Sequence, residues 1–118
     1  GVPFFRVAPL AADLIVKGEV EKGILICGTG MGMSQVANKY KGIRAACVES
    51  TYAARMCRAI NDSNVLCMGG WVIADIMGVE MVDLFLDIGF TEGLEEWRKE
   101  FLNNAKKEFQ VLEDKIYK

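Results

Sequence analysis

The stretch GILICGTGMGMS at residues 23–34 decides the fold. Residues 23–27 form a short apolar run bounded by glycines, which is typical of a strand buried on both faces of a parallel sheet. A glycine-rich turn follows at residues 28–32, and a helix is expected at residues 33–40, just before Gly42. A buried strand that passes through a tight turn into a helix predicts an α/β protein.

The alternation of strands and helices continues on both sides of this stretch. The other expected elements lie at residues 7–17 (helix), 43–48 (strand), 51–60 (helix), 64–68 (strand) and 75–86 (helix). Strands separated by helices pair in parallel through right-handed crossovers. Ligands in such sheets bind beyond the carboxyl ends of the strands, so the functional site is expected there.

The C-terminal part of the chain differs in character. Residues 94–118 are expected to form a long charged helix that still carries aromatic residues such as Trp97 and Phe101. Such a helix is too polar to be buried, yet its aromatic side chains need a partner, so we expect it to dock on a neighbouring subunit. Residues 1–93 are expected to form one α/β domain.

Composition limits the possible functions. The chain has 118 residues, of which 52% are hydrophobic and 25% charged, so it is expected to form one compact domain and not a disordered segment. Its net charge is −2, from 14 basic and 16 acidic residues, which does not favour binding to nucleic acid or to an anionic membrane. Its apolar stretches are shorter than the roughly 20 residues of a membrane span.

Histidine is absent, which removes the commonest general base and most zinc and haem sites. The four cysteines form no CxxC pair, so no metal site is predicted; they are Cys27, Cys47, Cys57 and Cys67. We interpret them as free thiols of a protein in the reducing cytoplasm. The chain opens with Gly1 and not with Met, which favours an excerpt of a longer polypeptide.

Cys27 and the glycines after it are the best candidates for chemistry. Alternate glycines let the backbone turn tightly and expose its N–H groups, which can hold an anion or an oxyanion. The loop matches neither the Rossmann nor the Walker A pattern, because Met33 and Ser34 stand where those patterns need glycine or lysine. A small anionic or polyhydroxylic ligand fits better than a nucleotide.

A thiolate at Cys27, favoured by the N–H groups and the helix dipole, could act as a nucleophile or as a base. From the residues alone, a small buried hydrophobic side chain explains Cys27 equally well. The other three cysteines are interpreted as core residues. Residues 61–64, Asn-Asp-Ser-Asn, are interpreted as a turn, and Gly69-Gly70 as either a turn or a second group of N–H donors.

Three segments together resemble a known family: CGTGMGMS at residues 27–34, GIRAA at residues 42–46, and NDSNVLCMGG at residues 61–70. They are similar to the RpiB/LacA/LacB sugar-phosphate isomerases, which are B-type ribose-5-phosphate isomerases and galactose-6-phosphate isomerases. The resemblance covers about residues 2–98. It implies a Rossmann-like α/β/α sandwich that forms a dimer or tetramer with shared active sites, and aldose–ketose isomerisation of a sugar phosphate without metal or organic cofactor.

The resemblance also implies roles for particular residues. Cys27 would move a proton between adjacent carbons through an enediolate, and Thr29 would assist proton movement at the oxygens. The loop would bind the substrate through Gly28, Gly30, Met31, Gly32 and Ser34. Asn61 would reach the substrate from a partner subunit, and Arg98 matches one of two phosphate-binding arginines.

The sequence departs from the family pattern at several positions. The Asp-His strand end with which family members begin has no counterpart, Ile60 replaces a histidine linked to ring opening, and Leu94 replaces the first phosphate-binding arginine. Two hypotheses follow: an isomerase with altered substrate preference, or a sugar-phosphate-binding or regulatory module that kept the fold and lost the chemistry. A thiol redox protein is a third reading, which the missing CxxC pair disfavours.

Overall fold

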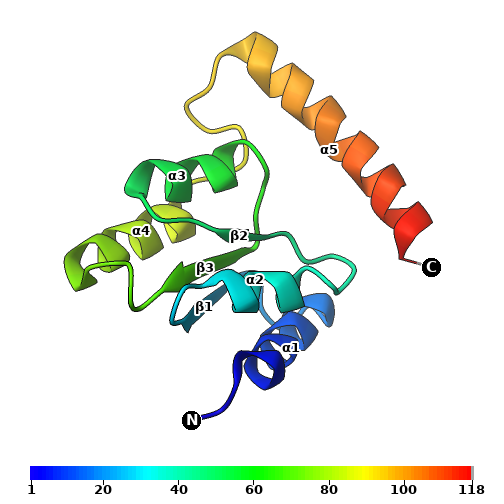
Figure 1. The fold of residues 1–118 in the computed structure, drawn as a ribbon. Coiled ribbons are helices and arrows are strands. Elements are labelled where there is room, and N and C mark those ends of the chain that lie inside the picture. Colours follow the sequence, from blue (N-terminus) through cyan, green and yellow to red (C-terminus); the bar gives the residue numbers. More distant parts are fainter. Residues whose placement is uncertain (118) are drawn as a thin grey trace.

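The computed structural model describes residues 1–117, so the last residue of the predicted helix 94–118, Lys118, lies outside the described residues. In chain order the elements are α1 (Phe4–Val16), β1 (Gly23–Cys27), α2 (Met31–Ala37), β2 (Ala45–Cys47), α3 (Thr51–Ala59), β3 (Val65–Gly69), α4 (Asp75–Asp87) and α5 (Glu96–Ile116). Figure 1 shows a small parallel sheet between helices, with α5 extending away from it. The predicted α/β class is confirmed.

The three strands are parallel and lie in the order β1-β3-β2. Every residue of β3 is buried, as expected for a central strand covered on both faces. The prediction that residues 23–27 are buried on both faces is wrong for Ile26, which is 57% exposed. The reason is that β1 forms one edge of the sheet, and a hollow of about 410 Å³ between Ile26 and α4 remains open to solvent.

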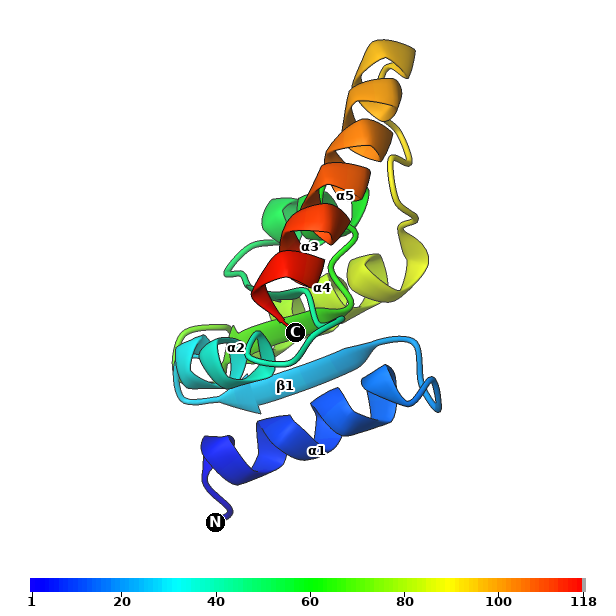
Figure 2. The same cartoon turned by 90° about the vertical axis from the view of Figure 1, so that its right-hand side faces the viewer.

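Two helices cover each face of the sheet, which confirms the α/β/α sandwich (Figure 2). On one face, α1 and α2 pack through Ala12 and Met33 against Leu25 and Val65. On the other face, Phe85 and Met81 of α4 pack with residues of α3 against Leu66. These side chains are almost completely buried, so hydrophobic burial holds all three layers together.

The ends of several elements differ from the prediction: α1 begins at Phe4 and not at residue 7, and α2 and β2 are shorter or shifted. The helix α2 begins at Met31 because Gly30 turns the chain with φ +81°, and it ends at Ala37. The side chain of Asn38 then bonds both backbone groups of Ala45, at 2.8 and 3.0 Å, so the helix does not reach residue 40. The strand β2 is limited to Ala45–Cys47, since the N–H of Arg44 bonds the Asn64 side chain and not a ladder partner.

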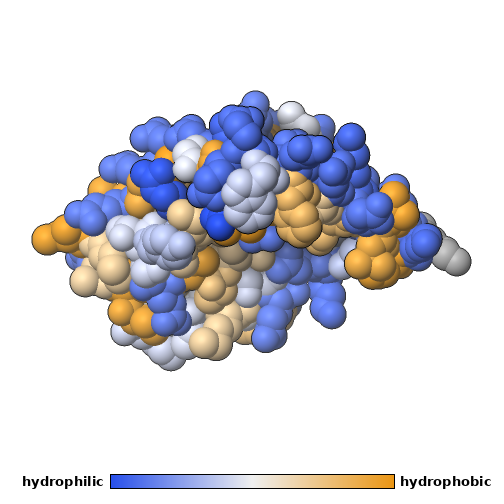
Figure 3. All heavy atoms as spheres, turned by 90° about the horizontal axis from the view of Figure 1, so that it is seen from above, coloured by the Kyte–Doolittle hydropathy of each residue, from blue (hydrophilic) through white to orange (hydrophobic). Residues whose placement is uncertain are grey.

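The helix α5 starts later than residue 94, because Gly93 adopts φ +78° in a turn and Glu95 stays extended. Its last turns are tied to the domain: Glu113 accepts a hydrogen bond from the N–H of Gly42 at 3.1 Å, and the hydroxyl of Tyr117 donates to the carbonyl of Asn38 at 2.7 Å. Several of its apolar side chains remain exposed, namely Trp97, Phe101, Phe109, Leu112 and Ile116. Figure 3 shows hydrophobic residues on the surface beside the C-terminal end of α5.

No helix within residues 1–117 has both the length and the apolar character needed to cross a bilayer. Within the same residues, no group of three or more histidine, cysteine or acidic side chains is arranged to hold a metal ion.

Candidate active site

The site begins where β1 ends. Cys27 is the last residue of β1, residues 28–30 turn the chain, and α2 starts at Met31. We call residues 28–32 the glycine loop. The N–H of Gly30 donates to the sulfur of Cys27 at 3.1 Å, so the loop folds its backbone donors back onto the thiol. Cys27 is half-buried and packs against the core cluster beneath α1 and α2.

The backbone donors favour the thiolate. Desolvation alone would raise the pKa of Cys27, but hydrogen bonds from the N–H groups of Met33, Gly30, Thr29 and Gly32 together hold it below the ordinary value of 9.0. This site is therefore suited to a sulfur anion, which is one of the two interpretations of Cys27 that the residues alone left open.

The loop brings most of the predicted site residues together. The predicted loop residues Gly28, Thr29, Gly30, Met31, Gly32 and Ser34 all lie within or directly after the turn. The hydroxyl of Thr29 accepts a hydrogen bond from the N–H of Met31 at 3.3 Å, and the hydroxyl of Ser34 donates to the carbonyl of Met31 at 2.8 Å. The Met31 side chain is exposed beside them, whereas Met33 is buried in the core.

The other cysteines differ from Cys27. Cys57 and Cys67 are buried, as predicted, and burial raises the pKa of the Cys67 thiol to about 12. Cys47 is only half-buried, and its thiol donates to the carbonyl of Thr29 at 3.6 Å. Desolvation, and after it the negative charge of Glu49, raise the pKa of Cys47. Cys47 therefore supports the loop as a neutral thiol, a contact that the sequence did not predict.

Gly69 and Gly70 support the loop from β3. A Cβ atom on Gly69 would lie 2.7 Å from backbone atoms of Gly28 and Thr29, so only glycine allows the two backbones to approach this closely. The N–H of Gly70 donates to the carbonyl of Cys27 at 2.8 Å. Gly69 and Gly70 therefore hold the glycine loop in place through a close backbone approach and a hydrogen bond.

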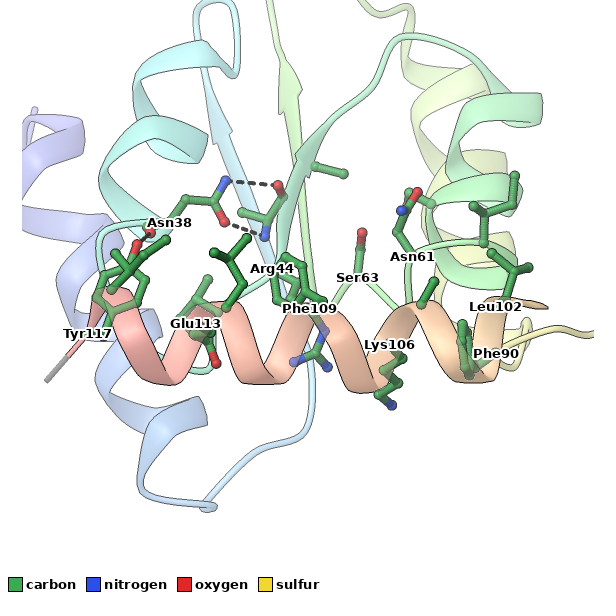
Figure 4. A pocket seen from close by; sticks show the side chains of 18 residues that line it. Asn38, Arg44, Asn61, Ser63, Phe90, Leu102, Lys106, Phe109, Glu113 and Tyr117 are labelled. Atoms are coloured by element: carbon green, nitrogen blue, oxygen red, sulfur yellow. Dashed lines mark hydrogen bonds between the residues drawn. The ribbon is translucent and has the colours of Figure 1, made fainter. Parts of the chain in front are cut away.

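Asn61 and Arg98 lie elsewhere. Cys27 pairs with Gly69 in the ladder, at the carboxyl ends of the strands, whereas Asn61 precedes Val65 at the amino end of β3. The strand between these ends spans roughly 13 Å. Asn61 lines a groove of about 640 Å³ between α5 and the rest of the domain (Figure 4). Arg98 lies on the first turn of α5, against Glu95 at 3.6 Å and over the ring of Trp97 at 5.1 Å.

The rest of the segment 61–64 is structural, as its interpretation as a turn predicted. Asp62 adopts φ +50°, and its carboxylate pairs with Arg58 at 2.8 Å. The side chain of Asn64 bonds the N–H of Arg44 at 2.7 Å and the carbonyl of Gly42 at 2.8 Å. These contacts fix the turn that carries Asn61.

Comparison with known proteins places the chain in a family. A family model described as Ribose/Galactose Isomerase matches residues 1–102. The chain belongs to the ribose/galactose isomerase family. The resemblance predicted from its motifs is thereby confirmed.

Relatives within the ribose/galactose isomerase family are named as isomerases of sugars or sugar phosphates. The chain is 62% identical to a 4-deoxy-4-sulfo-D-erythrose isomerase of Clostridium sp. (strain MSTE9), over 98% of this chain and 73% of that protein. It is 42% identical to ribose-5-phosphate isomerase B of Escherichia coli, over 79% and 62% of the two chains. The chain thus spans about three fifths of the length of several curated relatives that it matches.

The fold of the family is the fold found here. A solved structure of ribose-5-phosphate isomerase B from Clostridium thermocellum superposes with a TM-score of 0.86 and 34% identity, covering 98% of this chain and 74% of that one. The type B enzyme of Leishmania infantum gives a TM-score of 0.85 at 33% identity, over 98% and 71%. The predicted Rossmann-like sandwich is confirmed.

Proposed function

We propose that this chain catalyses aldose–ketose isomerisation of a sugar with an anionic terminal group, with Cys27 as the base. The observation that carries the proposal is the half-buried Cys27 at the end of β1. Its sulfur accepts a hydrogen bond from Gly30, and its pKa is lowered by the N–H groups of Met33 and of the glycine loop. No other thiol among residues 1–117 combines access to solvent with a lowered pKa.

The reaction needs one proton to move between adjacent carbons. The Cys27 thiolate removes the proton from the carbon beside the carbonyl, which leaves an enediolate, and the resulting thiol returns the proton to the former carbonyl carbon. The N–H groups of the glycine loop stabilise the negative oxygen that forms on the substrate. The Thr29 hydroxyl passes a proton between the two substrate oxygens. Each step conserves protons and electrons without a cofactor.

The substrate that we propose is a four-carbon aldose with a sulfonate or phosphate at C4. The most similar relative described above is named for 4-deoxy-4-sulfo-D-erythrose. A tetrose substituted at C4 has no free C4 hydroxyl, so it cannot close a five-membered ring and needs no group to open one. Ile60, which stands where the family resemblance leads one to expect a ring-opening histidine, is compatible with such an open-chain substrate.

We further propose that a second copy of the chain completes each site. Within one chain, Asn61 lies at the end of β3 opposite to Cys27. The first turn of α5, which carries Arg98, lies away from the end of β1 (Figure 1). Both residues would therefore act on the Cys27 of another chain. The exposed apolar side chains of α5 and the groove beside Asn61 offer a surface for that copy. Arg98 would then bind the anionic end of the substrate.

Turnover of a sugar panel tests the proposed chemistry. The panel contains 4-deoxy-4-sulfo-D-erythrose, D-erythrose 4-phosphate, D-ribose 5-phosphate and D-galactose 6-phosphate. The reaction of each sugar is monitored by NMR in deuterated water. We expect isomerisation of a four-carbon member, and its loss in Cys27→Ala. Undiminished turnover in Cys27→Ala would overturn the role of the thiol. Binding of a panel member by calorimetry, with no turnover of any, would instead favour the binding or regulatory module.

Mixing two inactive variants tests the shared site. If Cys27 and Asn61 act in the same site from different subunits, each single variant should be inactive on its own. When Cys27→Ala and Asn61→Ala are unfolded, mixed and refolded together, the mixture should regain activity. Random assembly of dimers makes half of them mixed, each with one intact site of two, so about a quarter of wild-type activity should return. Cys27→Ala mixed with the double variant Cys27→Ala/Asn61→Ala is the matched control and should stay inactive. No recovery in the first mixture would contradict sharing.

A further inference from the structure

Trp71 occupies an unusual position beside the glycine loop. It directly follows Gly69-Gly70 at the carboxyl end of β3, and it is 86% exposed. Its N–H donates to the carbonyl of Gly28 at 3.0 Å, so its backbone is fixed to the first residue of the glycine loop. The backbone of Trp71 is thus fixed to the residue that follows Cys27, and packing of the core does not explain why a large indole is exposed there.

The indole ring itself lies against the loop. A Cβ atom on Gly28 would lie 2.8 Å from three ring atoms of Trp71, Cδ2, Cε2 and Cε3. The ring therefore rests on Gly28 in a place that any side chain at position 28 would fill. One part of the indole is held against Gly28, the residue that follows Cys27, and most of its surface remains open to solvent.

Resting on the proposed function, we propose that the indole of Trp71 is the surface on which the carbon chain of the sugar lies, and that Trp71 is a specificity-determining residue of this site. The face of an indole carries partial negative charge, which attracts the polarised C–H groups of a polyol and repels an anion. The C–H face of the sugar covers the ring, while its sulfonate or phosphate points away from Trp71. The carbonyl end then meets Cys27 and the N–H groups of the loop.

Kinetics of two variants test this role. Trp71→Ala should raise KM about tenfold with a smaller change in kcat, because contact with the carbon chain is made in both the ground state and the transition state. Trp71→Phe keeps an aromatic face and should recover most of the loss. Leu10→Ala is the control: it removes another exposed apolar side chain, on the outer face of α1, and should leave both constants unchanged. Equal kinetics for Trp71→Ala and the wild type would overturn the role.

Two measurements work even when turnover is absent. The protein has two tryptophans, so in Trp97→Phe the emission reports Trp71 alone. With Cys27→Ala added to stop turnover, each panel sugar is titrated, and inorganic phosphate serves as the control. Separately, alkylation of Cys27 by bromohydroxyacetone, a three-carbon hydroxyketone, is compared with alkylation by iodoacetamide, in both cases by displacement of halide by the thiolate.

We expect at least one of two results. Tryptophan emission changes saturably with a sugar and not with phosphate, or the ratio of the bromohydroxyacetone rate to the iodoacetamide rate falls several-fold in Trp71→Ala. If neither occurs, Trp71 does not contact the substrate and the inference is wrong. Neither readout requires Cys27 to act as a base. That role is tested separately, and it is wrong if Cys27→Ala retains full turnover.

Discussion

Replacing Gly69 with alanine would push the glycine loop of the candidate site away from β3. The new Cβ atom would lie 2.7 Å from the carbonyl oxygen of Gly28 and from two backbone atoms of Thr29. Ordinary contacts of this kind are about 3.5 Å, so the loop must move by roughly 0.8 Å. No flexible side chain can absorb that movement, because all three atoms belong to the backbone.

The displacement acts on the donors that stabilise the thiolate. The N–H of Gly30 lies 3.1 Å from the Cys27 sulfur, and a shift of this size would lengthen or misalign that hydrogen bond. We expect turnover to fall about a hundredfold. The overpacked contact should also lower the free energy of unfolding by roughly 1–3 kcal/mol.

The assay follows alkylation of Cys27 by iodoacetamide as a function of pH, with peptide mass spectrometry to separate Cys27 from the other thiols. In Gly69→Ala the midpoint should move up toward the ordinary thiol value of 9.0. Gly70→Ala is the matched control, because its Cβ would meet its nearest atoms at 3.8 Å, an ordinary contact. If Gly69→Ala keeps the wild-type midpoint and melting temperature, the clamp between β3 and the loop does not position the donors.

Three further predictions concern stability. The pKa of Cys27 is lowered on folding, so its thiolate adds stability that is fully present above pH 9.0 and is lost as the pH falls through the folded-state value. In urea unfolding, the advantage of the wild type over Cys27→Ala should therefore grow as the pH rises from neutral to above 9.0, and a constant difference would contradict the lowered pKa. Asp62→Asn should cost about 3 kcal/mol at neutral pH, because it leaves the buried Arg58 without its carboxylate. Desolvation opposes ionisation of Asp62, but hydrogen bonds from Lys106 and Arg58 hold its pKa below 3.8, so the stabilisation is present above that pH and should vanish on acidification below it, where the two proteins should become equally stable. Ser50→Ala removes the hydroxyl that accepts a hydrogen bond from the N–H of Ala53 at 3.0 Å and caps α3, and it should cost about 1 kcal/mol by thermal unfolding with sugar turnover unchanged.

The layers of the fold could be predicted from local patterns because burial in a parallel sheet leaves a local signature. Residues 65–69 are apolar at every position, and all are buried. The order of the strands left no such signature. That β1 lies at an edge with Ile26 exposed follows from which strands pair, and the pairing of Gly23 with Val65 joins residues far apart in the chain. Helix ends were missed where side chains intervene, as Asn38 does at the end of α2.

For the candidate site too, the local features could be predicted from the sequence and the contacts between distant segments could not. Cys27 and the glycine loop lie within one short segment, so their residue types and spacing were sufficient to predict a turn with exposed N–H groups. The contribution of Gly69 and Trp71 depends on two segments about forty residues apart that approach within van der Waals distance. In the sequence, Gly69-Gly70 was compatible with an ordinary turn, and the single tryptophan after it carried no periodic pattern.

The amino end of β3 supports the proposed role of Asn61 on physical grounds. The turn before the strand holds Asp62 at φ +50°, a conformation that is uncommon outside glycine, and several cations fix its carboxylate: Arg58 at 2.8 Å, Arg44 at 3.7 Å and Lys106. Charges and strain concentrated in one turn restrict its motion, yet the residue that this turn presents, Asn61, is an exposed amide. A rigid turn would hold this exposed amide at a fixed position, as the proposed hydrogen bond to a substrate bound by a second chain requires.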